Sequence, residues 1–260
     1  MFVDFHVHPN LPSANADSWL NKWWANIARV KLNALVITEH AYKNPERAYT
    51  EMIRSQPSGS KVIVLPGVEA LTKEGIDVLA FAETDKIYDY NELTTPRALD
   101  MDELLDFFAK RKDVMGIIAH PFTPGTTSII THKGEEYTRN AINKVGAVEV
   151  HNGAMLGVMK ALEQTGLSVI FPEKYSRAKK TFELPKAFYP KKARLIAAGS
   201  DAHHPDGLGA GIKFNAKWNS RADAFRKIAS AHCSIIRQES CHPYRDMFTA
   251  FSEWRMKQWH

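Results

Sequence analysis

Short apolar runs that end in a histidine or a carboxylate recur along the 260-residue chain, and this pattern constrains its fold most. The first run, FVDFHVH, ends in His6 and His8, and later ones read ALVITEH, VIVLPGVE, VMGIIAH, AVEVH and LIAAGSDAH. Short apolar runs of this kind are typical of buried strands. Segments with helical spacing lie between them, for example Trp19, Trp23 and Ile27. Strands and helices are therefore predicted to alternate.

This alternation predicts parallel strands joined by helical crossovers, and enough such units close into a barrel. We therefore expect an α/β fold, with one barrel domain over residues 1–260. Because 44% of the residues are hydrophobic, the chain can fill a large core. Further helices are expected near 45–55, 153–165, 219–231 and 244–258. The carboxyl ends of the strands in such a barrel form one rim, where active sites lie.

Metal-binding residue types gather at these predicted strand ends. His6 and His8 are two residues apart on a strand and should point the same way. A single histidine at such a place is more often a hydrogen-bonded structural residue. So many titratable groups clustered without a cation would be costly, and a metal site is therefore predicted. The candidate ligands are His6, His8, His40, Glu69, His120, His151, Asp201 and His203.

Composition limits the class of protein. No apolar run approaches the ~20 residues of a membrane helix, and the strand-like start leaves no room for a signal peptide. Cys233 and Cys241 are too few for a disulfide framework. We therefore expect a cytoplasmic protein with reduced thiols and no membrane contact. The formal net charge of +5 suits anionic substrates but does not by itself indicate nucleic-acid binding.

The ordered motifs DFHVH, TEH, PGVE, AHP, EVHN and GSDAH, from Asp4 to His203, resemble the PHP (polymerase and histidinol phosphatase) superfamily. The resemblance implies a distorted (β/α)7 TIM-like barrel with its metal site at the carboxyl ends of the strands. It also implies two or three divalent metal ions and hydrolysis of phosphate esters. Mixed histidine and carboxylate ligands suit Zn, Mn or Fe better than Mg or Ca.

The resemblance also implies how the ligands are shared. One metal would be held by His6, His8, Glu69 and Asp201. Glu69 would bridge to a second metal held with His120 and His151, and a third would bind His40 and His203. Glu69, Asp201 and His203 would then be catalytic. A hydroxide between two cations would attack phosphorus in line. The leaving oxygen would take its proton from water on the third metal or, if that site is empty, from His203 or His204.

The sequence departs from the family pattern after the first histidine pair. Many relatives carry a further histidine or aspartate there, whereas this chain reads HPNLPSANADSW. Asp17 is the best substitute ligand and Asn15 a weaker one. Asp17 is equally suited to cap the following helix, since its carboxylate can accept the first free amides. The missing histidine argues against histidinol phosphate, which stays an alternative substrate.

Substrate contacts are expected from two segments. FTPGTTSIITHKGEEY, after His120, is predicted to be a loop over the site, with His132, Lys133 or Arg139 contacting phosphate. A basic insertion at about 168–193 joins the last two metal-bearing strands and carries Arg177 and Lys179. The insertion is either a wall that binds a multiply phosphorylated substrate or a solvated excursion with aromatic residues packed on the barrel. Asn152 and Gly153 are expected to be turn residues rather than substrate contacts.

Two function classes remain open from sequence. The first is a metal-dependent phosphoric ester hydrolase acting on a small phosphorylated metabolite, a nucleotide or an oligonucleotide end. The second is a non-enzymatic PHP-like barrel that serves as a nucleic-acid-binding or structural subunit. Because the two-metal ligand set is intact in this chain, the enzyme is favoured.

Overall fold

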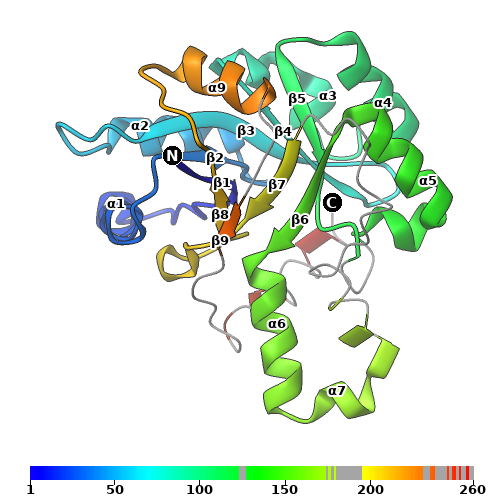
Figure 1. Ribbon diagram of the computed structural model, residues 1–260. Helices are drawn as coiled ribbons and strands as arrows, with labels where there is room; N and C mark the ends of the chain where they lie inside the picture. The colour runs from blue at the N-terminus through cyan, green and yellow to red at the C-terminus, as the bar shows by residue number, and fades with distance from the viewer. Residues whose placement is uncertain are drawn as a thin grey trace.

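The computed structural model describes residues 1–122, 127–173, 175, 176, 179, 195–230 and 235–237, with single positions at 245, 248, 249, 252, 256 and 257. Figure 1 shows its mixed α/β architecture. The strands are β1 (Phe2–Val7), β2 (Ala34–Ile37), β3 (Ile63–Leu71), β4 (Asp77–Ala82), β5 (Val114–Ile118), β6 (Ala147–Asn152), β7 (Leu195–Gly199), β8 (Gly211–Lys213) and β9 (Ile235–Arg237). The α-helices are α1 (Ala16–Val30), α2 (Pro45–Arg54), α3 (Asn91–Thr94), α4 (Met101–Lys110), α5 (Ile129–Val145), α6 (Gly153–Gln164), α7 (Leu167–Ile170) and α9 (Arg221–Ser230). Two short 3₁₀ helices are η1 (Asp85–Asp89) and η3 (Pro205–Gly207).

The described strands form one sheet in the order β7-β6-β5-β4-β3-β2-β1-β8-β9. The sheet curls so that the end of β7 meets β1 (Figure 1). The Asp201 amide donates to the His6 carbonyl at 2.7 Å, and Val7 forms a parallel bridge with Ala202. The sheet is therefore a nearly closed, TIM-like barrel, as the alternation of strands and helices predicted.

The strand directions correct the expectation of an all-parallel barrel. β4 is antiparallel to both β3 and β5, and β8 is antiparallel to β1. A tight turn causes the first reversal: Gly75 has φ 86°, and the Ile76 amide donates to the Thr72 hydroxyl at 3.0 Å. No helix separates β3 from β4, so the seven-unit (β/α)7 repeat is not confirmed.

The barrel interior is closed below the rim by aromatic and aliphatic side chains. Phe5 packs edge-on against Phe81 and tilted against Phe214, with ring centroids 5.9 and 6.1 Å apart. Phe5 and His6 would lie on opposite faces of a regular strand. The register of β1 with β2 shifts between Asp4 and Val7. Phe5 and His6 both lie within this irregular stretch. There Phe5 fills the core, and His6 faces the rim.

The helices on the outer surface bury their apolar faces against the strands. In α1, Leu20, Trp23 and Ile27 are buried and pack with Leu35 and Ile37 of β2. The helices predicted near 45–55, 153–165 and 219–231 are confirmed as α2, α6 and α9. Most of the helix predicted over 244–258 lies outside the described residues. Within the described part of the chain, no helix is both long enough and apolar enough to span a bilayer.

Candidate metal centre

The carboxyl ends of the strands bring seven of the eight predicted ligands into three overlapping groups. The groups are His6 with Glu69 and His120, His6 with His8 and Asp201, and His8 with His40 and His203. Within each group the ligand atoms all lie within 4.8 Å of one another. The topology therefore joins residues that are up to two hundred positions apart in the sequence into one cluster.

Glu69 lies at the centre of the first group. Its Oε1 is 3.4 Å from His6 Nε2 and 3.2 Å from His120 Nε2, and its Oε2 contacts His40 Nδ1. Although burial opposes ionisation, the Lys257 ammonium and His40 hold the pKa of Glu69 well below its ordinary value. The sequence suggested that Glu69 ends its strand. In the structure the strand does not end there, because β3 continues to Leu71. The Glu69 carboxylate nevertheless faces three histidines.

Asp201 joins the two N-terminal histidines in the second group. Its Oδ1 lies 3.4 Å from His6 Nε2 and 3.2 Å from His8 Nε2. Burial opposes ionisation here too, but His6 and His8 keep the pKa of Asp201 well below its ordinary value. The backbone of Asp201 is left-handed, with φ 51°, a conformation that is uncommon outside glycine and is enriched at functional sites.

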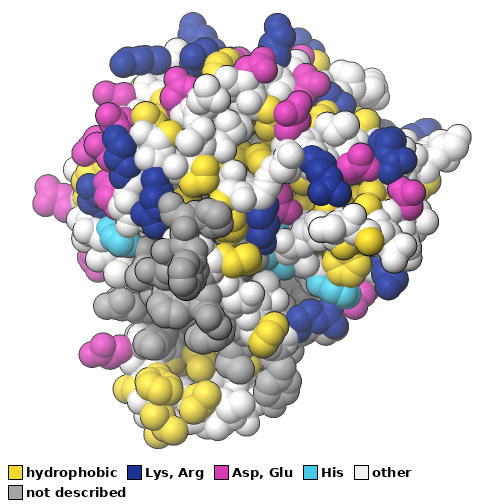
Figure 2. Space-filling model, turned by 180° about the vertical axis from the view of Figure 1, so that it is seen from behind, with side chains coloured by type: hydrophobic (Ala, Val, Ile, Leu, Met, Phe, Trp, Pro, Cys, Tyr) yellow, Lys and Arg dark blue, Asp and Glu magenta, His cyan; other side chains and the backbone are white. Residues whose placement is uncertain are grey.

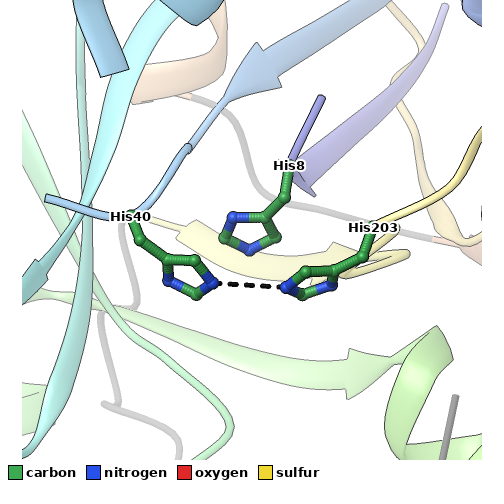
Figure 3. A group of neighbouring side chains, drawn as sticks. All are labelled: His8, His40 and His203. Carbon is green, nitrogen blue, oxygen red and sulfur yellow. Dashed lines mark hydrogen bonds between the residues drawn. The ribbon is translucent and has the colours of Figure 1, made fainter. Parts of the chain in front are cut away.

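The third group consists only of imidazoles. His40 Nε2 and His203 Nε2 point at each other 3.2 Å apart, and His8 stacks on both rings with centroids 4.2 Å away (Figure 3). Glu39 supports this group, with Oε1 3.6 Å from His8 Nδ1. Burial opposes ionisation of Glu39, yet its contact with His8 lowers its pKa to about 2. Glu39 is therefore an anion at neutral pH.

Glu149 is a functional residue that sequence reasoning missed. It is fully buried, its Oε1 lies 3.0 Å from His6 Nδ1, and its Oε2 accepts from the His120 amide at 2.8 Å. A neutral His6 that donates its Nδ1 proton to Glu149 would have the Nε2 lone pair available for a cation bound together with Glu69 and Asp201. Carboxylates in this position orient metal-ligating histidines. The available signal was an acidic residue inside the apolar run AVEVH.

Replacing Glu149→Gln is expected to weaken metal binding about 10- to 100-fold, since the carboxylate that orients His6 is lost. Competition with a chelating dye measures this affinity. Glu163→Gln is a matched control, because Glu163 is exposed and accepts from the Tyr175 hydroxyl at 2.6 Å. Equal metal affinity of the Glu149 variant and wild type would contradict this role.

Asn152 also supports the site, beyond the turn role expected from sequence. Its Nδ2 donates to Asp201 Oδ2 at 3.0 Å, and its Oδ1 accepts from the Met155 amide at 2.9 Å. The residue is thus the N-cap of α6, which is a preferred position for asparagine. One side chain therefore starts the helix and holds a candidate ligand.

His151 is buried on β6 but is not part of the three groups found among the described residues. Burial lowers its pKa to about 4, so the ring is neutral at neutral pH. Neutral imidazole is the form that binds metals. The assignment of His151 as a ligand of the second metal stays a prediction.

The structure corrects both interpretations of Asp17. The N-cap of α1 is Asn15, in left-handed backbone with φ 59°, while Asp17 lies within the first turn. The Asp17 carboxylate is 76% exposed and accepts from Arg54 Nη2 at 2.6 Å. Asp17 is therefore neither the cap nor part of the histidine cluster, because Arg54 holds it at the surface.

The predicted substrate contacts have mixed outcomes. The segment after His120 is not one long loop, because Ser128 caps α5 and the chain is helical from Ile129, apart from a kink at Gly134, where φ is 77°. Lys133 lies on α5 and pairs with Glu74 at 2.9 Å, and Arg139 is exposed on the same helix. Both remain untested as substrate contacts.

Most of the basic insertion, including Arg177, lies outside the described residues, and Lys179 is described only as an exposed position. The insertion therefore stays a prediction. His204 lies outside the three groups found in the described chain, and its Nδ1 contacts Arg245 Nη1 at 2.7 Å.

The donor atoms of the cluster fit divalent cations. Among the described residues, His6 Nε2 and both ring nitrogens of His8 are buried and make no hydrogen bond. An unpaired buried polar atom costs about 1–3 kcal/mol. The buried residues in the described chain also include five carboxyl groups but one ammonium, that of Lys257. Cations bound among these nitrogen and oxygen atoms would satisfy the donors and offset the negative charge.

Comparisons with known proteins support the fold. No family model and no curated protein matches the chain. The structure is similar to that of PsfC from Pseudomonas syringae, with TM-score 0.62, 17% sequence identity and 98% of each chain covered. It is also similar to the lesion-specific endonuclease PfuEndoQ from Pyrococcus furiosus, with TM-score 0.52, 17% identity and 90% of this chain covered. The matched region is 58% of the endonuclease chain. At these identities the likeness concerns the barrel architecture alone.

Proposed function

We propose that the chain is a metal-dependent phosphoesterase of the PHP superfamily. The observation that carries this proposal is the set of three overlapping donor groups, which share His6 and His8 and leave buried donor atoms without partners. When bound, two or three Zn, Mn or Fe ions would supply Lewis acidity and an activated water for attack on phosphorus. The order of motifs from Asp4 to His203 and the barrel fold support the same class.

Glu69, Asp201 and His203 would have different roles in this reaction. Glu69 touches histidines from both ends of the cluster, which is the arrangement expected of a bridging ligand. Asp201 holds the His6 and His8 side, supported by Asn152. His203 has an 11% exposed side chain, and its Nδ1 lies 3.0 Å from the Asp201 carbonyl. With the third metal site empty, His203 would be available to pass a proton to a leaving oxygen.

Phosphate esters of nucleic acid are the second candidate substrate class. The observation that favours them is the fold shared with a lesion-specific endonuclease. The non-enzymatic alternative is less well supported, because a barrel that only binds a partner has no use for three overlapping groups of metal-binding side chains.

A hydrolysis screen tests the proposal. The protein, loaded with Mn or Zn, is incubated with p-nitrophenyl phosphate, bis(p-nitrophenyl) phosphate and short single- and double-stranded oligonucleotides. We expect turnover of at least one phosphate ester that a chelator abolishes and added metal restores. No turnover of any ester by protein shown to contain metal would contradict the enzyme class.

A further inference from the structure

A lysine from the C-terminal part of the chain reaches the candidate centre. Lys257 is buried, and its Nζ lies 2.5 Å from Asp77 Oδ2 and 3.9 Å from Glu69 Oε2. Asp77 in turn lies 3.8 Å from His120 Nε2. The ammonium therefore lies beside one member of the first ligand group, Glu69, and pairs with Asp77, which faces a second member, His120. Neither Lys257 nor Asp77 was singled out from the sequence.

Contacts at both ends of the residue hold Lys257 in place. Arg97 Nη2 donates to the Lys257 carbonyl at 3.2 Å, while Arg97 Nη1 donates to the Lys73 carbonyl in the β3–β4 turn at 2.9 Å. The Arg97 amide also donates to the Leu71 carbonyl at 2.7 Å. One arginine thus ties the backbone of Lys257 to the hairpin that carries Glu69 and Asp77.

Stability alone is a weak reason for this arrangement. A buried ion pair often contributes no more to stability than apolar side chains of similar volume. The exposures of the three side chains differ: 10% for Lys257, 2% for Glu69 and 1% for Asp77. Of these three side chains, Lys257 is the most exposed.

We propose that Lys257 is a substrate-binding residue whose ammonium contacts the phosphoryl oxygens of the ester and of the released phosphate. This inference rests on the proposed phosphoesterase function. Lysine is a compact point charge with three donors and is a common phosphate ligand. Asp77 is a positioning residue for the ammonium, and Arg97 is a positioning residue for the backbone of Lys257.

Binding of orthophosphate, the product, tests this proposal without relying on turnover. Titration calorimetry on the metal-loaded full-length protein compares wild type with Lys257→Met and Lys257→Gln. Gln can still hydrogen-bond Asp77, so it provides a second variant if Met fails to fold. Because a hydrogen bond to a charged group is lost, phosphate is expected to bind about 10- to 100-fold more weakly to both variants. Lys257→Arg should recover part of the affinity.

Lys73→Met is the matched control, since Lys73 lies on the same hairpin as Asp77 and its half-exposed ammonium pairs with Glu103 of α4. Metal content, measured in parallel, should be equal in all variants. Unchanged phosphate affinity in folded, metal-loaded Lys257→Met and Lys257→Gln would overturn the proposal. A higher metal content in these variants than in wild type would also overturn the proposal, because the Lys257 ammonium would then occupy the place of a metal ion. Wild type that lacks metal or binds no phosphate would instead contradict the phosphoesterase function, and this inference with it.

Discussion

Replacing Glu69→Gln is expected to lower kcat for any phosphate ester by at least ~10²-fold, the lower range for losing one electrostatic element of a site. The carboxylate contacts His6 and His120 through Oε1 and His40 through Oε2, so this one side chain links three histidines. Glutamine keeps the size but removes the charge. It also places an amide donor where a ligand oxygen is needed.

Steady-state kinetics at saturating metal and elemental analysis of the same samples measure this effect. Glu136→Gln is the control, because Glu136 is exposed on α5, away from the ligand groups. The expected result is a loss of kcat together with a loss of bound metal in the Glu69 variant alone. A variant with near-normal kcat would show that Glu69 is not the bridging ligand.

Replacing Gly199→Ala is expected to damage both the barrel and the site. Gly199 ends β7 at the seam with β1, and an added Cβ would lie 2.3 Å from His6 Cβ and 2.8 Å from the His6 amide nitrogen. Backbone cannot move aside as a side-chain tip can, so the two strands would be forced apart. Overpacking of this kind costs about 3 kcal/mol, which corresponds to a fall in Tm of roughly 6–12 °C for a domain of this size.

Thermal unfolding followed by circular dichroism measures the change in Tm. Gly207→Ala is the control, since its added Cβ would lie no closer than 3.2 Å to any neighbour, the Ala202 Cβ. We expect a small change in the control and lower metal affinity in Gly199→Ala, because His6 shifts with the strand. A change in stability of about 1 kcal/mol shifts Tm by about 2–4 °C in a domain of this size. A Tm within about 1 °C of wild type for Gly199→Ala would therefore show that β1 and β7 do not pack this closely.

The sequence predicted those parts of the site that depend on local pattern. A histidine at the end of an apolar run is visible in one short segment, and this identified His6, His8, His40, His120 and His203 as neighbours. The alternation of strands and helices was likewise enough to predict a barrel. In both cases the long-range contacts could be inferred from the general rule that the carboxyl ends of barrel strands lie at one rim.

Other features depended on tertiary contacts with no local signal. Glu149 looks like an isolated charge in a strand until His6 is placed beside it, 143 positions away in sequence. Lys257 is 180 positions from Asp77. Asp17 was misjudged because its competing partner, Arg54, lies on another helix. β4 was not among the predicted strands, and it runs antiparallel to β3 because a glycine turn joins the two directly.

The exposed apolar side chains of α7 also lay outside the sequence-based expectations. Val169 and Ile170 are 83% and 65% exposed, and Figure 2 shows hydrophobic side chains gathered at this end of the molecule. They are part of the predicted insertion, of which the structure describes only a portion.

The central claim is that the rim of the barrel binds at least two divalent cations. Elemental analysis of protein purified without chelators tests it most directly, with zinc, manganese and iron measured against protein concentration. We predict at least two equivalents per chain, because three donor groups converge and buried nitrogen and oxygen atoms lack partners. Less than one equivalent, in protein never exposed to a chelator and unable to take up added metal, would contradict the account.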